Sequence, residues 1–277
     1  MSIDYENLKK KYFDIFDKNT QYFDFIITDV QFAYNEISKI LENEKINRVL
    51  EVGCGTGILI KELKDNFKNI EFTGLDPNES GFHNYEKISK KILNLDNSIK
   101  IVKSSIGSFE SKNKYDLIFS FNVFEHVDNQ HQYILNTVDL LETGGKNIIF
   151  APNYDFPYEP HFIIPIIFNK SITKKIFSKT INDHEKKTQE VGLWDALQLT
   201  GKKEIEIFLK KNNLNYTFDH EIINKMLNRA LNDTRFRKRQ GIAAKLAILG
   251  RKFYLDKIIF NLLKIPFPYM KLIIEKK

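Results

Sequence analysis

The stretch Val49-Leu-Glu-Val-Gly-Cys-Gly-Thr-Gly57 decides the fold, because a β-branched apolar run breaks abruptly into alternating glycines. A second apolar run follows at residues 70–75, and Asp76 ends it. In an open parallel sheet, a glycine-rich turn after one strand and an acidic residue after the next lie together at the carboxyl edge. The pattern therefore predicts a site for a cofactor that contains a nucleoside.

The glycine register indicates which cofactor this site takes. Gly53, Gly55 and Gly57 form G-x-G-x-G, whereas the dinucleotide fingerprint G-x-G-x-x-G needs a glycine at the position of Ile58. The stretch resembles motif I of class I S-adenosylmethionine-dependent methyltransferases. That resemblance implies S-adenosyl-L-methionine as the cofactor and S-adenosyl-L-homocysteine as the product.

The same resemblance implies which residues contact the cofactor. Asp76 would accept two hydrogen bonds from the ribose hydroxyls, and Glu51 would lie near the amino-acid end. The other expected contacts are the three glycines, Pro77, Ser105 and Ile106 near the adenine, and Ser120 and Asn122, where backbone carbonyls would hold the amino group. The Phe124-Glu-His-Val127 segment and the Gly144-Gly145 turn strengthen the likeness.

Apolar periodicity predicts alternating strands and helices after a helical segment at residues 5–44. Strands are expected at 46–52, 70–75, 99–103, 115–121, 146–150, 214–219 and 269–275, and helices at about 57–66, 80–94, 129–142 and 201–212, the last starting at Thr200. This alternation predicts an α/β fold with a doubly wound, mostly parallel seven-stranded sheet. The resemblance to class I methyltransferases implies their Rossmann-like fold. By resemblance, residues 269–275 should supply the antiparallel edge strand.

The whole chain, residues 1–277, is predicted to be a single methyltransferase domain. Residues 1–45 would form N-terminal helices, and residues 46–153 the cofactor-binding core. Two stretches exceed the minimal fold: residues 154–199, which are rich in proline and aromatics, and residues 221–264, which are helical and basic. We interpret both as insertions that form one helical cap over the substrate.

Bulk properties limit the location and the partners. The chain has no run of about 18 apolar residues and no signal-peptide pattern, and Cys54 is its only cysteine, so a cytoplasmic protein without membrane insertion is expected. The net charge of +6 is uneven, since residues 221–277 carry fourteen Lys and Arg against four acidic residues. This excess favours an anionic partner, although solvated helix faces explain it equally well. A monomer and a homodimer are both compatible with the sequence.

Two histidines are the candidate general bases. The sulfonium already activates the methyl group, so the protein must align the nucleophile and, for an alcohol, remove its proton. His126 lies in a Glu-His-Val motif that resembles ubiquinone-pathway methyltransferases, although a histidine bonded to backbone at a helix entry fits as well. His161 follows the fifth strand and is preferred. No Cys/His cluster, H-E-x-x-H motif or paired metal carboxylates occur, so no metal is predicted.

Polar residues near His161 and a basic run further along are the candidate acceptor contacts. They are Tyr154, Asp155, Tyr158 and Glu159, set between prolines that can hold them stiffly, and Arg235 and Arg239, which suit a phosphate. The run at residues 157–162, Pro-Tyr-Glu-Pro-His-Phe, resembles methyltransferases of bacterial surface-glycan gene clusters. That resemblance implies a polar acceptor that bears a hydroxyl.

The sequence thus predicts O-methylation of a small anionic acceptor, phosphorylated or nucleotide-linked, in the biosynthesis of a surface polysaccharide such as a capsule. N-methylation of a small amine or phosphoramidate-type compound is an alternative, because the sequence does not separate the two chemistries. An RNA methyltransferase would use the basic lobe. However, no RNA-binding module is evident, so nucleic acid is not the expected partner. A protein that binds the cofactor without transferring the methyl group is the last alternative.

Overall fold

The carboxyl ends of five parallel strands point toward the same side of the molecule in this computed structural model, which describes residues 2–16, 20–77, 83–96, 98–188, 190–253 and 265–277. The described strands of the main sheet follow the order β3-β2-β1-β4-β5-β9-β8. Their bounds are β1 Arg48–Val52, β2 Glu71–Leu75, β3 Lys100–Val102, β4 Tyr115–Phe121, β5 Leu141–Pro152, β8 Asn215–Phe218 and β9 Tyr269–Glu275. The mostly parallel seven-stranded α/β sheet predicted from the sequence is therefore confirmed.

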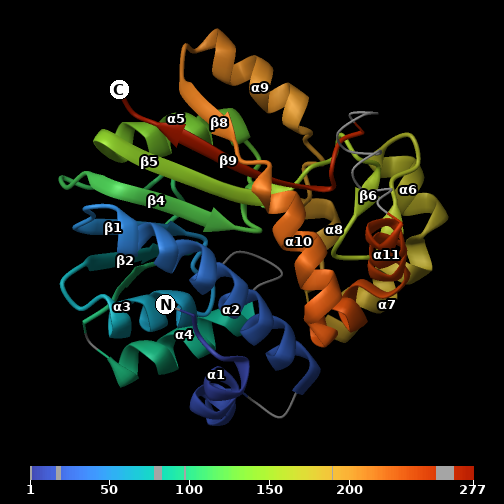
Figure 1. The fold of residues 1–277 in the computed structure, drawn as a ribbon, viewed down its shortest axis with the longest axis horizontal. Coiled ribbons are helices and arrows are strands. Elements are labelled where there is room, and N and C mark those ends of the chain that lie inside the picture. Colours follow the sequence, from blue (N-terminus) through green and yellow to red (C-terminus); the bar gives the residue numbers. More distant parts are fainter. Residues whose placement is uncertain (1, 17–19, 78–82, 97, 189, 254–264) are drawn as a thin grey trace.

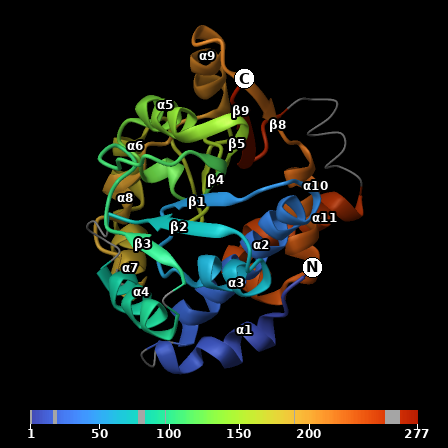
Figure 2. The same ribbon diagram turned by 90° about the vertical axis from the view of Figure 1, so that its left-hand side faces the viewer.

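Helices cover both faces of this sheet (Figures 1 and 2). They are α1 (Tyr5–Tyr12), α2 (Thr20–Asn43), α3 (Ile58–Asn66), α4 (His83–Leu95), α5 (Gln130–Leu140), α6 (Lys170–Ile176), α7 (Ser178–Thr188), α8 (Leu193–Ala196), α9 (Lys202–Lys211), α10 (Glu221–Asn232) and α11 (Thr234–Lys252). One apolar core packs helices α1, α2, α3, α4 and α10 against one face of the sheet. A second core packs α5 and α9 against the other face. Strand β1 is buried on both faces, as a central parallel strand requires.

The predicted edge position of the last strand is wrong. Strand β9 is antiparallel, but it lies between β5 and β8, and β8 forms the edge. Burial explains the order: Leu272 and Ile274 of β9 are fully buried, whereas the side chains of β8 alternate between exposed and half-buried. A half-polar strand tolerates the edge better than an apolar one does.

The start of α9 also differs from the prediction. Thr200 does not cap the helix. Instead, the side-chain oxygen of Asn153 accepts a hydrogen bond from the backbone N–H of Lys202, and Asp155 accepts one from Lys203. These bonds satisfy donors that a helix start leaves without partners. The capping oxygens therefore come from the segment after β5, about fifty residues earlier in the chain.

The two predicted insertions lie beyond the carboxyl ends of the parallel strands, where α6, α7, α8 and α11 gather at the right of Figure 1. The first insertion contains a small hairpin of β6 (Tyr158–Glu159) and β7 (Ile164–Pro165). It has an apolar cluster of its own around the fully buried Trp194. The second insertion is helical through α10 and α11, with a kink at Gly241, and its residues 254–264 lie outside the described part.

The basic second insertion pairs with the N-terminal helix α2. Arg229 and Arg239 contact the carboxylate of Asp29 at 2.8 and 2.6 Å, and Lys225 contacts Glu36 at 2.7 Å. These ion pairs tie the cap to the N-terminal segment. Part of the uneven charge seen in the sequence is thus balanced inside the molecule rather than by an external anion.

Among the described residues, no helix combines the length and apolarity needed to cross a bilayer.

Candidate active site

A cavity of about 1390 Å³ lies at the carboxyl edge of the sheet, under the cap. The loops after β1, β2, β3 and β4 supply its floor, helix α2 supplies one wall, and residues of α5 and of both insertions line the other sides. The edge beyond the carboxyl ends of the strands is where open α/β sheets bind their ligands. The volume is ample for a nucleoside cofactor together with a small acceptor.

The glycine loop after β1 brings its backbone close to this cavity. Gly53 and Gly55 adopt φ angles of 73° and 51°, in the left-handed region that favours glycine. A Cβ atom at Gly53 would lie 2.2 Å from a methyl group of Val123, so the loop after β4 leaves no room for a side chain there. The backbone N–H of Gly55 donates to the Asp76 carboxylate at 2.7 Å.

Two carboxyl groups face the cavity on either side of this loop. Glu51 is buried, and its Oε2 has no hydrogen-bond partner among the described residues. Burial, and then the charge of Asp76, raise the pKa of Glu51 to about 8. A buried carboxyl oxygen without a donor suits a ligand that carries a cation. The bare glycine loop, Asp76 and this carboxyl therefore fit S-adenosylmethionine, which has ribose hydroxyls and an ammonium group.

The structure places most of the other predicted cofactor residues at the same cavity. Pro77, Ser105, Ile106 and Asn122 line it. Asn122 has a φ angle of 51°, and its side-chain oxygen accepts a hydrogen bond from the Tyr269 hydroxyl at 2.8 Å. The side chain of Ser120 is fully buried and does not line the cavity.

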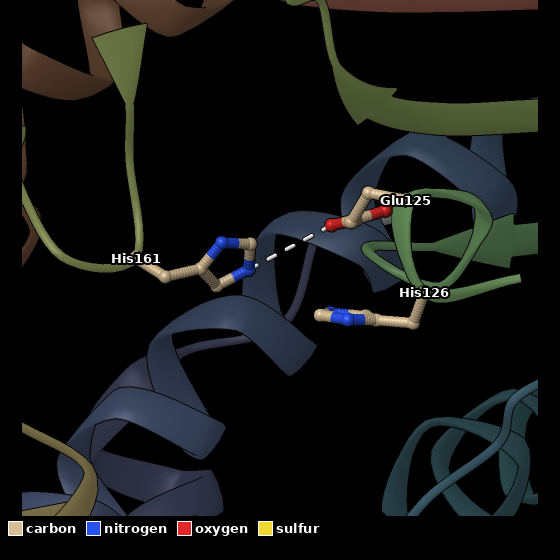
Figure 3. Close-up of side chains that lie close together, drawn as sticks. All are labelled: Glu125, His126 and His161. Carbon is tan, nitrogen blue, oxygen red and sulfur yellow. Dashed lines mark ion pairs between the residues drawn. The ribbon is translucent and has the colours of Figure 1, made fainter. Parts of the chain in front are cut away.

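The two candidate bases come together at the cap side of the cavity, beside an acidic residue (Figure 3). His126 and Glu125 belong to a short 3-10 turn after β4, and His161 lies in the loop between β6 and β7. The two imidazole centroids are 5.5 Å apart. The Nε2 of His161 lies 3.7 Å from Glu125, and its Nδ1 lies 2.6 Å from a carboxylate oxygen of the fully buried Glu159.

The environment separates the pKa values of this group. Burial alone would lower the pKa of His161, but the carboxylates of Glu159 and Glu125 outweigh it and raise that pKa to about 9. Burial, assisted by the charge of His161, lowers the pKa of His126 to about 3. Burial raises the pKa of Glu125 to about 7, against the attraction of His161. Such divergent values in one cleft are typical of functional sites.

The predicted acceptor residues divide into two groups. Arg235 and Arg239 line the main cavity, where Arg235 pairs with Glu6 and Arg239 with Asp29. The other four lie outside its lining. Tyr154 donates to Glu159, Glu159 holds His161, and Asp155 caps α9. Tyr158 donates to Gln240 and lines a smaller cavity of about 140 Å³.

Several cavity residues were not predicted. Glu125, which lies beside His161 but outside the cavity lining, was not predicted either, although it stands next to His126 in the motif that carries the resemblance. His184 lines the cavity and packs against Phe162, with ring centroids 4.8 Å apart. Asp29, Tyr85 and Glu190 also line the cavity, and no motif in the sequence marks them. Lys187 and Lys238 complete its rim.

A comparison with known families supports this assignment of the site. Residues 50–146 match a family model described as a methyltransferase domain. The matched range contains the glycine loop, Asp76, Glu125 and His126. The chain is an S-adenosylmethionine-dependent methyltransferase.

Two curated proteins illustrate the sequence likeness of this methyltransferase. An uncharacterized protein of Mycobacterium tuberculosis, Rv1509, is 27% identical over 214 residues, which cover 76% of this chain and 73% of that protein. The ubiquinone biosynthesis O-methyltransferase of Rickettsia felis is 30% identical over 132 residues, which cover 47% of this chain and 48% of that enzyme. The match to the second relative therefore spans about half of each protein.

Solved structures share the fold of the methyltransferase at low identity. The plantazolicin methyltransferase BpumL, solved with S-adenosylhomocysteine, is 13% identical with a TM-score of 0.50, covering 98% of this chain and 90% of that one. The phosphoethanolamine N-methyltransferase 2 of Haemonchus contortus is 16% identical with a TM-score of 0.51, and the match covers 88% of this chain and 52% of that one. At these identities the likeness concerns the fold.

Binding of S-adenosylmethionine to the methyltransferase at pH 7 is expected to release a proton. With a pKa of about 8, Glu51 is mostly protonated in the free protein, and a cationic ammonium beside it favours the charged carboxylate. Affinity should therefore rise with pH, by up to about tenfold per unit, and level off above about pH 8. Calorimetry in two buffers of different ionisation enthalpy measures the release.

The Glu51→Gln variant should bind the cofactor with no proton release and a flat pH dependence. Glu142→Gln, at a half-buried carboxylate on β5 that pairs with Arg48 away from the cavity, is the matched control and should behave as the unaltered protein does. Equal proton release by the protein and its Glu51→Gln variant would show that another group titrates.

Proposed function

We propose that this methyltransferase methylates an oxygen atom of a small, polar, anionic acceptor, phosphorylated or nucleotide-linked, in surface polysaccharide biosynthesis. The observation that carries the proposal is the arrangement of His161. Its Nδ1 is hydrogen-bonded to the buried Glu159, and the His161 side chain lines the same cavity as Glu51 and Asp76. S-adenosylmethionine supplies the activated methyl group when bound there. What remains for the protein is to orient a hydroxyl and to accept its proton.

The Glu159 contact orients His161 as a general base. A carboxylate that accepts from Nδ1–H leaves Nε2 as the atom that can take a proton from the acceptor, and it stabilises the imidazolium formed. Nε2 acts as a base only in the neutral ring, whose fraction increases as the pH rises toward the pKa of about 9. Tyr154 and the backbone N–H of Phe162 in turn donate to Glu159, so the carboxylate is held in place. We therefore assign Glu159 and Tyr154 to positioning. His126, on the same cavity wall, is the alternative base.

Oxygen is favoured over nitrogen as the acceptor atom by two observations. A neutral amine needs no base, whereas the site holds a histidine braced by a buried carboxylate. The relative from Rickettsia felis is named an O-methyltransferase. N-methylation of a small amine or phosphoramidate-type compound is the second candidate.

The anionic part of the acceptor would lie at the rim of the cavity. Lys187 and Lys238 line it from the two insertions, and neither forms an ion pair within the described part of the chain. Arg235 and Arg239 are nearby, but their charges are shared with carboxylates. The same internal pairing reduces the basic surface that an RNA substrate would need. We propose a cytoplasmic protein, monomeric or homodimeric, that acts on a free metabolite.

A methyl-incorporation screen tests the acceptor class. We expect labelled S-adenosylmethionine to label a phosphorylated or nucleotide-linked sugar, but not the neutral sugar, a small amine or a short RNA. The Lys187→Ala/Lys238→Ala variant should raise KM for that acceptor at least about tenfold, because two charged contacts are lost, and should leave kcat nearly unchanged.

Lys112→Ala, at an exposed lysine outside the cavity lining, is the matched control and should alter neither constant. Labelling of the amine or of RNA instead would replace the proposed acceptor. Cofactor binding with no labelling of any acceptor would favour a protein that does not transfer the methyl group.

A further inference from the structure

Glu125, His126 and His161 form a compact group of possible metal ligands. Within the described part of the chain, one ligand atom from each residue lies within 4.8 Å of the other two. Figure 3 shows the carboxylate and both rings directed toward a common space. His126 and His161 also line the main cavity, so this space is continuous with the place of the acceptor.

Glu125 is the least satisfied member of the group. Its side chain is about 1% exposed, and neither carboxylate oxygen accepts a hydrogen bond from another described residue. The Nε2 of His161, 3.7 Å away, is beyond hydrogen-bond distance. Burying a carboxylate without donors is costly, and proteins that retain one commonly use it to bind a cation or to do chemistry.

Glu159 provides the outer support that metal-binding histidines usually have. Its carboxylate, fully buried, lies 2.6 Å from Nδ1 of His161 and also accepts from the backbone of Phe162 at 2.7 Å. A carboxylate on Nδ1 fixes the ring and directs the Nε2 lone pair away from it, here toward Glu125. This carboxylate–histidine–ligand order is characteristic of metal sites.

We propose that Glu125, His126 and His161 bind one divalent transition-metal ion whose remaining coordination positions face the acceptor cavity. Two imidazoles and one carboxylate suit Zn²⁺, Mn²⁺, Fe²⁺ or Co²⁺, whereas Mg²⁺ and Ca²⁺ prefer all-oxygen sites. Ligand atoms bound at about 2.0–2.1 Å lie about 3.3 Å apart, so these atoms, which now lie within 4.8 Å of one another, approach by up to about 1.5 Å on binding. Rotation of the three side chains supplies that movement.

The inference deepens the proposed function and rests on it for the identity of the acceptor. In the metal-free protein His161 takes the proton of the acceptor hydroxyl. With the ion bound, His161 would be a ligand instead of the base, and the ion would lower the pKa of a bound acceptor hydroxyl so that its proton could pass to solvent water. No metal-ligand spacing in the sequence marks this group, because His161 is separated from Glu125 and His126 by about 35 residues.

Direct metal titration tests the site without any acceptor. The full chain, stripped with a chelator, is titrated with Zn²⁺ by calorimetry and with Co²⁺ by absorption spectroscopy. We expect one ion per chain and a Co²⁺ spectrum of nitrogen and oxygen ligation. Glu125→Gln and His161→Gln should each weaken binding at least about tenfold, and Glu159→Gln by about 10- to 100-fold. His131→Gln, at a ring stacked on Phe208 outside the cavity lining, should bind as before.

Each variant must retain S-adenosylmethionine binding, which shows that it is folded. Absence of stoichiometric binding, or binding that survives both Glu125→Gln and His161→Gln in such folded variants, overturns the metal site. Failure of the metal site with methylation intact leaves the proposed function standing. A bound ion with no methylation of any anionic acceptor supports the metal site and contradicts the proposed function.

Discussion

The Asp76→Asn variant is expected to bind S-adenosylmethionine with a Kd that is higher by about a hundredfold or more. The carboxylate at the end of β2 lines the cavity and already accepts the backbone N–H of Gly55 in the glycine loop. We expect it also to accept the two ribose hydroxyls, and an amide accepts through only one oxygen. Loss of charge-assisted hydrogen bonds worth about 1.5–3 kcal/mol each accounts for the magnitude. Calorimetric titration with the cofactor measures it.

Asp139→Asn, a change at an exposed aspartate whose side chain contacts Lys114 on the surface, is the matched control and should bind normally. Because Asp76 also fixes the glycine loop, the thermal unfolding of the variant must be measured alongside. A variant that unfolds as the unaltered protein does and binds S-adenosylmethionine within about threefold would remove Asp76 from the cofactor site.

The cofactor half of the structure was predictable because its determinants are local. The apolar run of β1, the glycines and Asp76 lie within about thirty residues, and each acts through its own backbone or through the strand beside it. The sheet follows from the alternation of strands and helices, since parallel pairing requires crossovers. The place of β9 in the sheet did not follow, because strand order depends on which face each strand buries in the assembled core.

The acceptor half was predicted less fully because it is assembled from distant segments. Asp155 reads as a site residue beside His161, yet it caps α9, which begins almost fifty residues later. The basic residues of α10 and α11 suggest an anion, yet two of them pair with Asp29 on α2. Glu125 is recognisable as a site residue only in the folded chain, where the β6–β7 loop places His161 beside it. Sequence spacing carries no information on such partners.

The His161→Gln variant is expected to lower kcat for methyl transfer by about 10²- to 10⁴-fold, the range by which a positioned base accelerates a reaction. Glutamine keeps a polar side chain near Glu159 but can neither take up a proton nor ligate a metal as an imidazole does. The Kd for S-adenosylmethionine should stay within about twofold, because Glu51, Asp76 and the glycine loop lie elsewhere on the cavity wall. Single-turnover transfer to the acceptor and cofactor titration give the two numbers.

His126→Gln separates the two candidate bases. If His161 takes the proton, His126→Gln should cost less than His161→Gln in chelator-treated protein, because its low pKa makes His126 a weak base. His131→Gln should leave kcat for methyl transfer unchanged. A larger loss with His126→Gln would transfer the role of base to that residue. If His161→Gln transfers the methyl group at the normal rate, the hydroxyl needs no base from this cluster, and an acceptor that arrives already deprotonated, or a neutral amine, becomes the better substrate class.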